Sequence, residues 1–162
     1  MTIIVPNGAA APAGQLIQRT SSWTFAAGST GSVAAHIVFT ITGRVFVDLV
    51  TAHCTTTLTS AGTPAITLGT TNDVDAFMAA PTGGGPGLAT GDWWTVAASS
   101  AGAVGPLSVV TGDRVTSNRF KLLSENVVLD IPVSTLTGGV LVFDIWYYPI
   151  TSDGGLAVTT PA

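Results

Sequence analysis

The chain is poor in charged residues. Only 9% of its 162 residues are charged, with nine acidic and five basic side chains, whereas soluble domains carry about 25%. The surface must therefore consist largely of Thr, Ser, Gly and Ala. Such a surface is weakly hydrated and tends to associate when the net charge is small. We expect much of it to be covered by copies of the chain or by a larger partner.

Basic residues are especially scarce. Lys121 is the single lysine, four arginines accompany it, and the net charge is −4. Neutralising phosphates requires clustered Lys and Arg, so we expect no nucleic-acid partner. No stretch matches the run of about 20 apolar residues that spans a bilayer, so we expect no membrane partner either.

Cysteine is limited to Cys54, which excludes an internal disulfide and disfavours a disulfide-stapled secreted module. The first five residues lack the basic segment of a signal peptide, and their apolar run ends at Pro6. The length suits one domain with a substantial core. We expect a single β-sandwich domain over residues 15–162, preceded by an extended N-terminal arm over residues 1–14.

Short β-branched runs separated by Gly, Pro, Asn and Ser clusters recur along the chain, which is typical of sandwiches and barrels. The predicted fold is all-β: an antiparallel sandwich (jelly-roll-like) or a barrel, with at most one short helix. The one helical window is 72–80, with Asn72 or Asp73 as N-cap and Pro81 as the stop. The predicted strands are 15–25, 35–42, 44–58, 65–68, 93–97, 107–110, 119–123, 127–131 and 140–148.

Two of these runs predict particular placements. Residues 35–42 and 44–58 form either one bent strand with Gly43 at a bulge or two strands joined by a tight turn. In 140–148 both alternating sets of side chains are largely apolar. A strand covered on both faces is central or interfacial.

Catalytic motifs are not apparent. His53 and Cys54 are adjacent, but neighbours on a strand point to opposite faces and cannot form a thiol–base dyad; a packed cysteine is the simpler reading. His36 and His53 would need a third ligand to hold a metal. Residues 72–75 begin like a calcium loop but lack its later glycine and acidic residue, and helix capping explains them. We expect no cofactor and no metal.

The aromatic doublet Trp93-Trp94 points to a surface. One of two consecutive strand residues must face away from the core, either as a half-buried side chain or as an interface anchor, where Trp is enriched. The candidate interface residues are Ile3, Ile4, Val5, Trp93, Trp94, Trp146 and Tyr148.

Three segments carry a resemblance to a known group: 41–47 (ITGRVFV), 65–72 (AITLGTTN) and 138–149 (GGVLVFDIWYYP). Together they resemble small virion-associated head decoration (cement) proteins of tailed bacteriophages, over most of the chain from about Gly43 onward. The resemblance implies a β-rich, non-enzymatic protein, made in the host cytoplasm, that oligomerises on the outer capsid surface and braces the major capsid protein. It transfers no binding residue. We expect a homotrimer.

Two other functions remain open. A receptor- or glycan-binding domain of a tail fibre or baseplate would stack sugars on Trp93, Trp94 or Trp146. A carbohydrate-active enzyme would use Glu125, the only glutamate, as its acid with one of the aspartates. The copy number in purified particles separates a head protein from a tail protein.

The proposed arm gives a first prediction. Ile3, Ile4 and Val5 form an apolar patch on a tether of small residues, and burying them is worth roughly 1.5 to 3 kcal/mol each. We expect the patch to dock on a neighbouring subunit or on the capsid by adding a strand to an open sheet edge. Deleting the first eight residues should weaken oligomer or particle binding, measured by light scattering and co-sedimentation, while the domain stays folded. Unchanged binding would rule the arm out.

Overall fold

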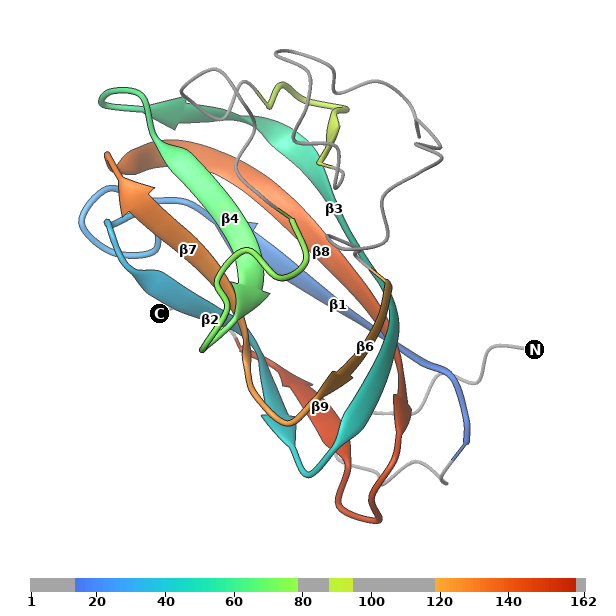
Figure 1. Ribbon diagram of the computed structural model, residues 1–162. Helices are drawn as coiled ribbons and strands as arrows, with labels where there is room; N and C mark the ends of the chain where they lie inside the picture. Colours follow the sequence, from blue (N-terminus) through green and yellow to red (C-terminus); the bar gives the residue numbers. More distant parts are fainter. Residues whose placement is uncertain (1–13, 79–87, 95–118, 160–162) are drawn as a thin grey trace, which may run out of the picture.

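The computed structural model describes residues 14–78, 88–94 and 119–159. Within these ranges the chain forms nine strands and no helix. They make two antiparallel sheets that do not close into a barrel (Figure 1), which confirms the predicted all-β sandwich. The strands are β1 (Ile17–Thr24), β2 (Ala35–Thr42), β3 (Val45–Ser60), β4 (Ala65–Thr70), β5 (Trp93–Trp94), β6 (Arg119–Leu123), β7 (Val127–Val133), β8 (Leu136–Pro149) and β9 (Gly155–Val158).

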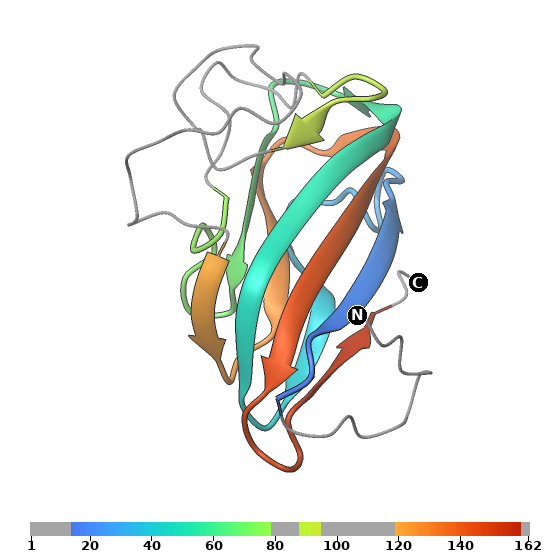
Figure 2. The same cartoon turned by 90° about the vertical axis from the view of Figure 1, so that its right-hand side faces the viewer.

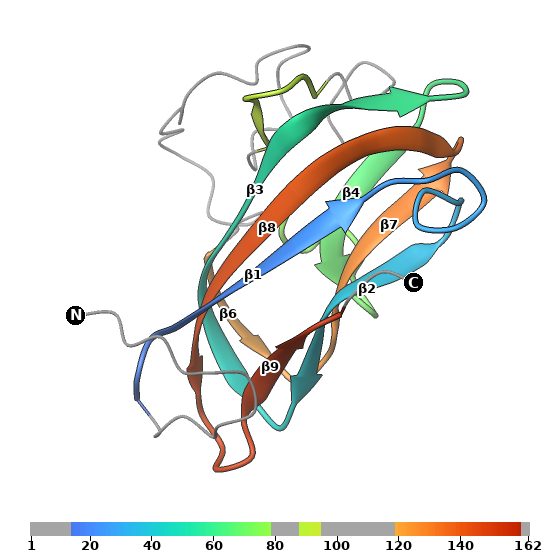
Figure 3. The same ribbon diagram turned by 180° about the vertical axis from the view of Figure 1, so that it is seen from behind.

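Two long strands form the centre of the five-stranded sheet. β3 and β8 run antiparallel from Val45 opposite Pro149 to Ser60 opposite Leu136. β1 pairs with the other side of β8, while β5 and β6 both pair with β3. The second sheet has the order β4-β7-β2-β9. Figures 2 and 3 show β3, β8 and β1 as one layer of the sandwich.

The strand pairs are nested as in a jelly roll. β1 pairs with β8, β2 pairs with β7, and β3 pairs with β6. The innermost pairing is the bridge between Leu68 of β4 and Met78. Each pair lies inside the previous one in the sequence, so the chain resembles one long hairpin wound across two sheets. Pairing of β3 with β8 and of β4 with β7 then completes the sheets. Nested pairing of this kind is found in jelly rolls, one of the forms that the sequence allowed for the sandwich.

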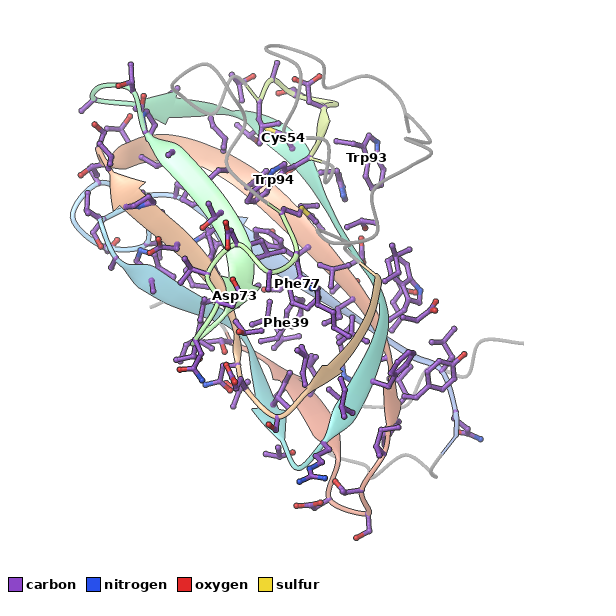
Figure 4. The ribbon with its side chains drawn as sticks, in the orientation of Figure 1. Phe39, Cys54, Asp73, Phe77, Trp93 and Trp94 are labelled. Atoms are coloured by element: carbon purple, nitrogen blue, oxygen red, sulfur yellow. The ribbon has the colours of Figure 1, made fainter. Side chains whose placement is uncertain are left out.

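The core lies between the two sheets. Alternate residues of β8, namely Leu141, Phe143, Ile145 and Tyr147, are at most 2% exposed because successive strand side chains point to opposite faces. Phe39 of the second sheet belongs to the same buried cluster and lies between the layers in Figure 4. The residues of β8 that lie between these four buried ones point to the outer face of the sheet. As predicted, β8 is central, with a neighbour on each side.

Gly43 lies in a tight turn between two strands, which was one of the two arrangements the sequence allowed. β2 ends at Thr42 and β3 begins at Val45, but the strands belong to different sheets. The turn therefore carries the chain across the sandwich. Gly43 adopts a φ of +59°, and a Cβ there would lie 2.5 Å from side-chain atoms of Thr151 and Asp153. Glycine adopts the positive φ without strain, and because it has no Cβ it avoids the clash with Thr151 and Asp153.

The predicted helix over 72–80 is wrong for residues 72–78, which form turns. The chain folds back along the edge of β4: the N–H groups of Phe77 and Met78 donate to the Leu68 carbonyl at 2.9 Å, and the Leu68 N–H donates to the Met78 carbonyl. The backbone groups of Phe77 and Met78 are therefore hydrogen-bonded to strand β4 and not to other residues of a helix. The asparagine and aspartate that suggested an N-cap lie in the turn that reverses the chain.

Other predicted strands differ in extent. β9 was not predicted, because a four-residue strand after Asp153-Gly154 gives little periodic signal. The predicted strand 93–97 is observed at 93–94; its remaining residues, the predicted strand 107–110 and the arm residues 1–13 lie outside the described residues.

The fold-back places Phe77 in the core, where it is fully buried. We expect Phe77→Ala to reduce the free energy of unfolding by about 3 to 5 kcal/mol, the usual cost of a large cavity. Val74→Ala is the control, since Val74 lies in the same turn but is 36% exposed, and it should change stability little. Chemical denaturation measures both. Equal effects of the two substitutions would contradict the fold-back.

Candidate functional site

The outer face of the five-stranded sheet is the first candidate surface. Val142, Asp144, Trp146 and Tyr148 alternate with the buried residues of β8 and are partly exposed. Their neighbours across the sheet come from β1, β3, β5 and β6. Residues that are distant in the sequence therefore share one continuous face.

One end of this face is apolar. Phe46 of β3 lies opposite Tyr148 on one side and Leu122 on the other, and the Phe46 and Tyr148 rings are 6.5 Å apart between centroids. Trp146 lies opposite Leu49. Leu122 is 61% exposed, the highest value among the large apolar side chains that the structure describes. We call Phe46, Leu122, Trp146 and Tyr148 the aromatic face.

A polar row crosses the middle of the sheet. Asp144 Oδ1 accepts hydrogen bonds from Thr20 Oγ1 and from Gln18 Nε2, the latter at 3.2 Å. Thr20 lies directly opposite Asp144, and Gln18 lies opposite Trp146. The carboxylate therefore has partners from the adjacent strand, next to the aromatic face.

Trp93 and Trp94 point to opposite faces of the sheet, as predicted from the alternation of side chains along a strand. Trp94, opposite Ala52, faces inward and is 4% exposed, so it is not available for the interface or for sugar stacking. Trp93 lies opposite His53 on the outer face, with ring centroids 4.8 Å apart. Figure 4 shows the two indoles on opposite sides of the chain.

The predicted interface residues are thus only partly brought together. Trp146 and Tyr148 share the aromatic face, and Trp93 lies on the same sheet face beyond the polar row. Ile3, Ile4 and Val5 lie outside the described residues. Phe46 and Leu122 were missed because only strand pairing places them beside Tyr148.

A second apolar surface lies on the other sheet, and sequence reasoning missed it. Ile37 of β2 is 39% exposed, and Val133 at the end of β7 is 55% exposed. Val33, 52% exposed, precedes β2 where the Ile131 N–H donates to the Ala34 carbonyl at 3.0 Å, which places it beside the end of β7. Val33 and Val133 lie toward one end of the β2–β7 pair, and Ile37 lies farther along it, opposite Val128 and beyond Asp130. We call these three exposed side chains the aliphatic patch. It faces away from the aromatic face because the two lie on opposite layers of the sandwich.

A shallow hollow of about 310 Å³ has Asp73, Glu125, Lys121 and Thr70 among its lining residues. Hydrogen bonds from Asn72 lower the pKa of Glu125, and its Oε2 accepts from the Asn72 backbone N–H at 3.1 Å. A general acid needs a raised pKa, so this environment disfavours Glu125 in that role. A hydrogen bond shared with Asp75 raises the pKa of Asp73.

The histidines and the cysteine have structural surroundings. Cys54 is buried, and its Sγ donates to the Thr56 carbonyl at 3.0 Å. His53, the preceding residue, is on the opposite face, as predicted. His36 lies on the other sheet, 5.7 Å from the Trp23 ring and within 3.0 Å of the Ser32 carbonyl.

Among the residues that the structure describes, no three His, Cys, Asp or Glu side chains are grouped so that they could hold a metal ion. None of the described segments forms a helix of the length and apolarity needed to cross a bilayer.

The buried Cys54 gives a prediction about reactivity. Burial raises the pKa of its thiol, and the thiolate is the reactive form. We expect an aromatic disulfide reagent at neutral pH to label Cys54 only as fast as the protein unfolds. Leu122→Cys in a Cys54→Ala background is the matched control, since it places a thiol at an exposed position and should react at once. Rapid labelling of native Cys54 would contradict the structure.

No protein-family model, curated protein or solved structure matches this chain.

Proposed function

We propose that this chain is a structural virion protein, a decoration or cement protein that oligomerises on the outer surface of a phage head and stabilises contacts between capsomers. The observation that carries the proposal is that apolar side chains are exposed on both sheets, Leu122 on one and Ile37 and Val133 on the other. A bridging protein needs at least two contact surfaces. A domain that binds one ligand needs only one.

The chemistry of these surfaces suits contact with proteins. Exposed apolar patches mark interaction sites, and the cores of interfaces are depleted in charge and enriched in aromatic residues. Trp146 and Tyr148 supply the aromatic residues on one sheet, while Ile37 and Val133 supply aliphatic ones on the other. Few charges must be desolvated when a surface of this composition is covered.

Charge and resemblance support the same role. A net charge of −4 suits the outer side of a shell better than the side against packaged DNA. The segment 138–149 that resembles head decoration proteins lies within β8, the central strand that carries Trp146 and Tyr148. Jelly rolls occur in viral capsid proteins and also in lectins, so the fold by itself does not decide between these roles.

One observation favours a second candidate, a receptor- or glycan-binding domain of a tail fibre or baseplate. Trp146 lies beside Gln18 and Asp144 on an open sheet face, and an aromatic ring next to polar groups can stack on a sugar while bonding its hydroxyls. The aliphatic patch has no part in such a site. We therefore rank this function second.

The copy number in purified particles tests the head role. We expect quantitative mass spectrometry to find the chain in numbers comparable with the major capsid protein. Numbers comparable with a tail component would contradict the proposal and favour the receptor-binding role.

We assign the capsid contact to the aliphatic patch. Ile37→Glu combined with Val133→Glu should weaken binding to particles that lack the chain by at least about tenfold, since burial of such side chains is worth roughly 1.5 to 3 kcal/mol each. Val74→Glu is the control because Val74 is exposed but lies outside the patch. Co-sedimentation measures binding, and thermal unfolding shows that the variants fold. Equal binding by the double variant and the wild type would reject this contact.

A further inference from the structure

We propose that the polar row and the Trp146 indole beside it form a binding site for a neutral oligosaccharide. The site lies on the outer face of the five-stranded sheet, whereas the capsid contact assigned above lies on the other sheet. A chain held to a shell by the aliphatic patch therefore leaves this site open. Binding of the sugar concerns the isolated protein and is independent of its location in a head or a tail.

The polar row has hydrogen-bonding capacity to spare. A carboxylate can accept about four hydrogen bonds, and the two that Asp144 accepts, from Thr20 and Gln18, are both at Oδ1. The Gln18 amide also has a second N–H and a carbonyl oxygen. Thr51 lies opposite Asp144 on β3, and its Oγ1 is buried with no hydrogen-bond partner among the described residues. Three adjacent strands therefore bring unused donors and acceptors together.

Trp146 supplies the apolar half of the site. It follows Asp144 by two residues on the same face of β8, lies opposite Gln18, and is partly exposed. A sugar ring has an apolar C–H face and a polar edge, so a ring stacked on the indole turns its hydroxyls toward the polar row. Each hydroxyl both donates and accepts, which matches a carboxylate beside an amide. The bonds within the row already hold these side chains, so binding orders few further rotamers.

The charge on Asp144 decides which ligand fits. The cores of protein interfaces are depleted in charged residues, and a protein covering the polar row would have to desolvate this carboxylate. Sugar hydroxyls instead replace the hydrogen bonds that water makes to it. An anionic sugar would be repelled by Asp144 and by the net charge of −4. The ligand is therefore a neutral sugar.

Trp93 gives the site a second aromatic ring and thus a preference for chains over single sugars. Val142, four residues before Trp146 on β8, lies opposite His53, which in turn lies opposite Trp93. Four residues at about 3.3 Å each and two strand spacings of about 4.8 Å separate the two tryptophans by roughly 16 Å. Only an oligosaccharide of several units contacts both rings.

An NMR titration of the nitrogen-15-labelled protein tests the site without any substitution. The probes are maltohexaose, cellohexaose and chitohexaose, with hexagalacturonic acid as the anionic control of equal length. We expect at least one neutral probe to bind saturably and to shift the signals of the Gln18 side-chain amide and the Trp146 indole N–H. The indole signals of Trp23 and Trp94 should not move, because both side chains are buried. The anionic control should bind at least about tenfold more weakly.

Substitutions then assign the two rings, with titration calorimetry as the readout. Trp146→Ala should raise the dissociation constant of the bound hexasaccharide and of its disaccharide at least about tenfold, whereas Trp93→Ala should weaken only the hexasaccharide. Leu122→Ala is the matched control, since Leu122 is exposed on the same face but lies outside the site, and it should bind like the wild type. Asp144→Asn keeps the size of the side chain and serves if Trp146→Ala does not fold; it should also weaken binding.

Three results would overturn the proposal. The first is that no neutral probe binds at millimolar concentration. The second is binding that leaves the Gln18 and Trp146 signals unmoved. The third is an affinity that Asp144→Asn does not change, or that Leu122→Ala lowers as much as Trp146→Ala does.

Discussion

The antiparallel pairing of β3 with β8 is the constraint on which the rest of the structure depends. Val45 lies opposite Pro149 and Ser60 lies opposite Leu136, with register shifts along β3 between them, and this pairing decides which side chains enter the core and which face outward. It buries Phe143 and places Trp146 outside. A shift by one residue would exchange the two sets. Core packing on one side of the sheet thus specifies the aromatic face on the other.

Much of this arrangement was predictable from local pattern. The alternation in 140–148 predicted a central strand with two apolar faces, and β-branched runs between turn residues predicted the sandwich. What could not be predicted depends on long-range pairing. Residues 72–78 had a helix-like beginning, but hydrogen bonds to Leu68 hold them against β4. Likewise, no local signal places Phe46 beside both Leu122 and Tyr148.

The candidate interface residues also separate into those that a local pattern reveals and those that depend on long-range pairing. Trp146 and Tyr148 were identified because their strand is strongly periodic, whereas Trp94 was chosen together with Trp93 although only one of the two faces outward. The aliphatic patch was missed because only the pairing of β2 with β7 brings the end of β7 alongside the residues before β2. An exposed valine is unremarkable in a sequence. Two apolar surfaces on opposite layers become apparent only in the folded chain.

A cryo-electron microscopy reconstruction of the intact particle tests the central claim most directly, because it locates both surfaces at once. The account predicts density for this chain on the outside of the head, with β2 and β7 against the shell. It would be contradicted if the chain were absent from the head, or if both sheets faced solvent where it is bound.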